Sequence, residues 1–121
     1  MTMFTPNPIV VNALRDADHC IGRATVRLEG IEMQWRRNAD DRQEDYWRLQ
    51  RLIEGVGVCR WDGPTELVPR PLISQLGSVI TTMEEWRKPM LDKPVEDLKR
   101  ALSILTDCAD RVGGSDTGLA S

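Results

Sequence analysis

Histidine, a residue type that is common in catalytic and metal sites, is scarce in this chain of 121 residues. The chain has one histidine, one tyrosine and one phenylalanine, and it contains neither a Cys-x-x-Cys nor a His-Glu-x-x-His motif. The short run Gly55-Val56-Gly57 lacks the third glycine of a phosphate-binding loop. We therefore expect a protein that is not an enzyme and that uses no cofactor and no metal ion.

The single histidine does not create a nucleophile–base pair with its neighbour. His19 precedes Cys20 directly, so on a helix the two side chains point about 100° apart. The other cysteines, Cys59 and Cys108, stand at wide and irregular spacings. This pattern indicates reduced thiols and not a disulfide framework.

Long apolar runs are also absent. No stretch approaches the roughly 18 residues that a membrane helix needs, and residues 1–8 lack the basic and apolar regions of a signal peptide. We expect a cytoplasmic protein. The net charge of -3 argues against a nucleic-acid partner. Arginine supplies 13 of the 16 basic residues, which suggests a GC-rich bacterial genome.

Helical patterning, by contrast, is abundant. Asn7-Pro8 is a typical helix start, because Asn caps free N–H groups and Pro fits the first turn. Apolar residues then recur at a 4-3-4-3 spacing over nearly four heptads, which predicts a long amphipathic helix that lies along another helix. This first seam consists of Val10, Leu14, Ala17, Ile21, Ala24, Leu28, Ile31 and Trp35.

Two arrangements remain open for the next segment. Residues 36–45 are almost entirely polar, yet the seam resumes in register at residues 49–56. The unbroken register favours one helix from Pro8 to Glu54. A capping box formed by Asp41 and Glu44 favours a turn near residues 38–41, and so a helical hairpin.

A Pro/Gly-rich loop and two further helices are predicted for the second half. Asp62-Gly63 permits a short β-hairpin in the loop, although the surrounding prolines favour irregular structure. Helices are expected from Pro71 to Lys88, before Pro89, and from Asp92 to Val112, before Gly113. The sequence thus predicts one all-α domain over residues 1–121, a small helical bundle whose ends (1–7 and 113–121) are flexible.

Several apolar residues are candidates for contact with another protein, because interfaces concentrate Trp, Met and Arg. Trp35 and Trp86 continue apolar seams, so they either fill the core or mark an interface, whereas Trp47 and Trp61 lie off the seams. The first seam also exceeds the later helices in length, which predicts a homodimer that covers it. The candidate interaction residues are Leu14, Ile21, Leu28, Ile31, Trp35, Trp47, Leu72, Leu76, Val79, Met83 and Trp86.

The opening residues Met3–Pro8, the arginine-rich long first helix, the chain length and the lack of catalytic groups resemble the QslA-type quorum-sensing anti-activators of Pseudomonas. The resemblance implies a helical protein that binds the ligand-binding domain of a LuxR-type transcription factor such as LasR. It further implies that binding breaks the factor's dimer and prevents DNA binding. No residue roles follow from it.

We therefore predict a regulatory module that occupies a partner's dimerisation surface. Two alternatives from other classes remain. One is a structural or chaperone-like subunit of a secretion or phage assembly. The other is a small DNA-binding regulator, in which the polar side of the Leu72–Lys88 helix would act as the recognition helix.

Overall fold

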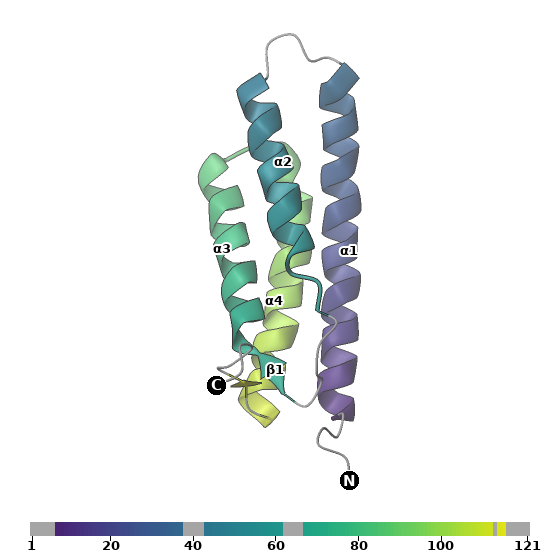
Figure 1. Ribbon diagram of the computed structural model, residues 1–121, viewed down its shortest axis with the longest axis vertical. Helices are drawn as coiled ribbons and strands as arrows, with labels where there is room; N and C mark the ends of the chain where they lie inside the picture. Colours follow the sequence, from purple (N-terminus) through teal and green to yellow (C-terminus); the bar gives the residue numbers. More distant parts are fainter. Residues whose placement is uncertain (1–6, 38–42, 62–66, 113, 116–121) are drawn as a thin grey trace.

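A computed structural model describes residues 7–37, 43–61, 67–112 and 114–115. Within these ranges the chain forms four α-helices, namely α1 (Pro8–Arg37), α2 (Gln43–Gly57), α3 (Arg70–Trp86) and α4 (Asp92–Val112). Figure 1 shows them side by side, with successive helices running in opposite directions. A 3-10 helix, η2 (Pro89–Leu91), lies between α3 and α4. The predicted all-α bundle is confirmed.

The first half of the chain is a helical hairpin. After α1 ends at Arg37, α2 begins at Gln43 and runs back along α1 (Figure 1). The Arg36 guanidinium donates hydrogen bonds to the Tyr46 hydroxyl at 3.1 and 3.3 Å, which links the two helices near the turn. The alternative of one continuous helix is therefore wrong. Asp41, half of the expected capping box, lies outside the described residues.

The local helix signals operate as predicted. The Asn7 side-chain oxygen accepts a hydrogen bond of 2.9 Å from the Ile9 amide, so Asn7 caps α1. Pro89 follows the end of α3, and α4 begins at Asp92 with Pro94 in its first turn. These signals depend on neighbouring residues only, so they act independently of how the helices pack.

The first seam forms one side of the core. Ala17, Ala24 and Leu28 are at most 1% exposed, and α1 packs more extensively on α4 than any other two elements pack on each other. The alanines allow the close approach expected from the sequence, and the helix that approaches belongs to the same chain. On α4, Ala101 and Leu105 are fully buried in the same core.

A short parallel pairing joins the loop before α3 to the segment after α4. Strand β1 (Val68–Pro69) pairs with β2 (Gly114–Ser115), and both β1 residues are buried. Gly114–Ser115 thus have a defined place within the C-terminal segment that was expected to be flexible. The β-hairpin considered at Asp62-Gly63, and the remainder of both chain ends, lie outside the described residues.

Among the described residues that are not glycine, Arg87 alone has a positive φ, at 56°. It is the C-cap of α3 in the left-handed conformation, and its amide donates to the Glu84 carbonyl at 3.2 Å. Left-handed backbone is disfavoured for a residue with a Cβ atom and is open to glycine.

We predict that Arg87→Gly raises the free energy of unfolding by about 0.5–1 kcal/mol, because glycine removes this conformational penalty. Chemical denaturation measures the change. The control is Arg100→Gly in the interior of α4, which should lower the stability by about 1 kcal/mol. A loss of stability in the Arg87 variant would contradict the account of this cap.

Candidate protein-binding site

Most of the predicted interaction residues lie inside this chain. The buried members are Leu14, Ile21, Leu28, Trp35, Leu72, Leu76, Val79 and Met83. Ile31 and Trp86 are partly buried against the same core, as is Trp61. Trp47, in contrast, has 53% of its surface exposed.

Burial within the bundle is enough to explain the apolar character of the first seam. A homodimer through that seam would require the bundle to open, so a second copy would have to meet a different surface. The structure does not place the eleven predicted residues on one face. It leaves Trp47 accessible on the outside of α2 and Trp86 partly accessible at the end of α3.

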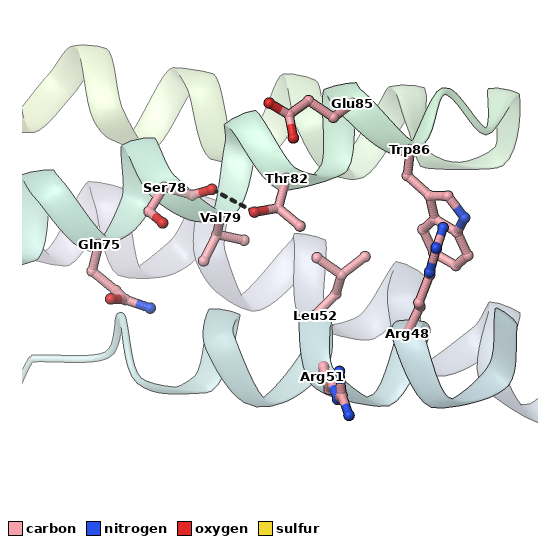
Figure 2. Close-up of a pocket in the computed structure, with 9 residues that line it drawn as sticks. All are labelled: Arg48, Arg51, Leu52, Gln75, Ser78, Val79, Thr82, Glu85 and Trp86. Atoms are coloured by element: carbon pink, nitrogen blue, oxygen red, sulfur yellow. Dashed lines mark hydrogen bonds between the residues drawn. The ribbon is translucent and has the colours of Figure 1, made fainter. Parts of the chain in front are cut away.

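A cleft of about 540 Å³ lies between α2 and α3. In Figure 2, Leu52 of α2 and Val79 of α3 point toward each other across it. Both side chains are largely buried, with 5% and 6% of their surface exposed. We call this cleft the α2–α3 groove. Its other lining residues are Arg48 and Arg51 from α2 and Gln75, Ser78, Thr82, Glu85 and Trp86 from α3.

The groove exists because the facing side chains of α2 and α3 are mostly polar. Gln75, Ser78 and Thr82 follow one another at three- and four-residue spacing, so they lie on one side of α3. Polar side chains gain less from burial than apolar ones, so they do not draw α2 into close contact. Among neighbouring helices of the bundle, α2 and α3 accordingly pack on each other least.

A glycine sets the separation of the helices at one end of the groove. A Cβ atom on Gly55 would lie 3.2 Å from Cγ2 of Val79, which is tighter than an ordinary van der Waals contact. The absence of that atom lets the C-terminal part of α2 approach α3 closely.

Trp86 occupies the other end of the groove. Its ring meets Trp35 edge-on, with centroids 6.0 Å apart and an interplanar angle of 87°. The Arg48 guanidinium and the Lys88 ammonium each lie 5.9 Å from the Trp86 ring centroid, which is within cation–π range. Lys88 also pairs with Asp45 of α2 at 3.5 Å. Trp86 is therefore fixed in place and still partly accessible.

One hydroxyl group of the groove is already engaged within its own helix. The Thr82 hydroxyl donates to the Ser78 carbonyl at 3.0 Å, within its own helix (Figure 2). Among the described residues, no three His, Cys, Asp or Glu side chains lie together as metal ligands would. In the same part of the chain, no helix combines the length and the apolar character needed to cross a membrane.

Sequence reasoning missed the groove, although it singled out Val79, Trp86 and the polar side of the Leu72–Lys88 helix. The residues Gln75, Ser78 and Thr82 form a polar row on a predicted helix, and such a row usually faces solvent. Their pairing with Arg48 and Arg51 depends on how α2 packs, which the spacing alone does not determine. The exposed apolar residues Ile9 and Val26 of α1, and Val58 directly after α2, were also not singled out as candidate interaction residues.

Comparisons with protein-family models, with curated proteins and with solved structures found no match to this chain. The residues and geometry of the α2–α3 groove are therefore the main guide to function.

The three cysteines are free and buried. Burial raises the pKa of the Cys59 thiol to about 11, because the charged thiolate loses its hydration. The thiol group also donates to the Gly55 carbonyl at 3.4 Å.

This shift predicts a stability change at alkaline pH. Because folding raises the pKa of Cys59, its thiol keeps the proton to a higher pH in the folded state than in the unfolded state. The resulting contribution to the free energy of unfolding is complete below the ordinary pKa of 9.0 and is lost as the pH rises to about 11. Urea unfolding should therefore show a stability that falls across this window more steeply in the wild type than in Cys59→Ala. If the stability of the wild type and of Cys59→Ala falls equally steeply with pH, the raised pKa of Cys59 does not contribute to it.

Proposed function

We propose that this protein is a regulatory, non-catalytic module that binds a partner protein in the α2–α3 groove. The observation that carries the proposal is the composition of the groove, in which an anchored Trp86 and two arginines surround the apolar pair Leu52 and Val79. Tryptophan and arginine next to a desolvated apolar centre are the usual components of interface hot spots.

The dimensions of the groove favour a helical segment of the partner. From Gln75 to Trp86, α3 lines the groove over about 16 Å, which corresponds to roughly three turns of a docked helix. Packing a helix between two others is a common mode of peptide recognition. Such a complex would extend the bundle by one helix.

The partner that we propose is a LuxR-type transcription factor such as LasR, in the cytoplasm of a bacterium. By occupying the factor's dimerisation surface, the protein would prevent DNA binding and raise the threshold for quorum-sensing genes. The similarity to QslA-type anti-activators supports this choice of partner, and the groove supplies a surface that could make the contact.

A matched pair of threonines on α3 allows a direct test. Thr82 lines the groove and Thr81 does not, while both are exposed and both donate their hydroxyl to the carbonyl four residues earlier. We predict that Thr82→Trp fills the groove and lowers partner recovery about tenfold or more, and that Thr81→Trp leaves it unchanged.

The measurement is affinity capture from a bacterial lysate, with captured proteins identified and quantified by mass spectrometry. Recovery of a LuxR-type factor by the wild type and the Thr81 variant, but not by the Thr82 variant, is the expected result. Capture of secretion or virion components in the same pattern would favour the structural or chaperone-like alternative. Equal loss in both variants, or in neither, would exclude the groove as the binding site.

A further inference from the structure

The α2 side of the groove carries two arginines without an acidic partner in the described part of the chain. Arg48 and Arg51 are exposed, and their three-residue spacing puts them on one side of α2. The Arg48 guanidinium lies over the Trp86 ring. Three other described arginines form ion pairs, namely Arg27 with Asp97, Arg36 with Glu32 and Arg60 with Asp18.

The α3 side of the groove does not neutralise these arginines. Three of its lining residues, Gln75, Ser78 and Thr82, are uncharged. The one acidic residue is Glu85, and Figure 2 shows its carboxylate pointing away from α2. The groove therefore presents two cations along one wall, although the whole chain has a net charge of -3.

The floor of the groove restricts what kind of anion fits. Leu52 and Val79 keep only 5% and 6% of their surface exposed, so the apolar contact that the groove offers comes mainly from the partly buried Trp86 ring, and a free inorganic anion or a nucleic-acid backbone does not use it. Proteins bind nucleic acid tightly when many cationic side chains contact its phosphates, and this groove offers two, Arg48 and Arg51. An occupant that contacts both the apolar lining and the two arginines of the groove needs an apolar face bordered by carboxylates.

We infer that the α2–α3 groove takes an amphipathic helix whose polar edge is acidic. Apolar side chains one turn apart on that helix pack against the partly accessible Trp86 ring and the remaining exposed edges of Leu52 and Val79. An Asp or Glu beside them accepts hydrogen bonds from Arg51 and Arg48, since the guanidinium fork matches a carboxylate. This inference rests on the proposed function, because it specifies the partner segment that the groove would bind.

The test uses a displayed library of helical 14-residue peptides with randomised surface positions, selected on the wild-type protein. We expect the selected peptides to be enriched in Asp and Glu next to an apolar pair. Replacing these acids by Asn and Gln should weaken binding about tenfold, as should Arg51→Gln, and added salt should lower the affinity further. Arg15→Gln, an exposed arginine of α1, is the control that keeps full affinity.

Several results would overturn the inference. These are selection of basic or uncharged helices, failure to select any helix, and displacement of the selected peptide by duplex DNA. A wild-type dimer that Arg51→Gln dissociates, as seen by light scattering, would assign the groove to a second copy of the chain.

The Thr82→Trp variant separates failure of this inference from failure of the proposed function. If it abolishes peptide binding while Arg51→Gln does not, the groove binds helices without selecting acidic ones, and only the charge preference is wrong. If neither variant changes binding, the peptides use another surface, and both proposals are wrong.

Discussion

The burial of the α1 seam is the constraint on which the rest of the bundle depends. Over its 30 residues α1 spans about 45 Å, whereas the 21 residues of α4 span about 32 Å, so α4 covers only part of the seam. The C-terminal part of α1 is covered by α2 and by Trp86, which meets Trp35 there. The burial of this C-terminal part of α1 therefore depends on α2 packing against α1. The side of α2 that faces α3 carries Arg48 and Arg51 beside Leu52, and the groove follows from that.

The groove combines features that usually oppose each other in a small bundle. Leu52 and Val79 are almost fully buried, yet they form the bottom of an open cleft. Trp86 is held by Trp35, Arg48 and Lys88, so little side-chain freedom remains to be lost when a partner packs against it. A preorganised aromatic residue reduces the entropic penalty of association. For these reasons the groove is a better candidate for binding than the exposed Trp47.

Local signals made the helices predictable, and non-local packing limited the prediction of the site. Asn7, Pro89 and Pro94 act on their immediate neighbours, so the start of α1, the end of α3 and the start of α4 could be read from the sequence. Periodicity shows that a helix face is buried but not what buries it, and Leu28 could equally have faced a second molecule. The polar row on α3 resembled a solvent-exposed face because its relation to Arg48 and Arg51 arises only when α2 folds back along α1.

Fluorine NMR of the protein labelled with 5-fluorotryptophan tests the central claim most directly, because Trp86 lies in the groove and Trp47 lies on the outside of α2. The ligand-binding domain of a LuxR-type factor such as LasR is added, and the resonances are assigned with single Trp→Phe variants. The account predicts that the Trp86 resonance changes most on binding. A Trp86 resonance that stays unchanged while Trp47 alone responds would contradict it.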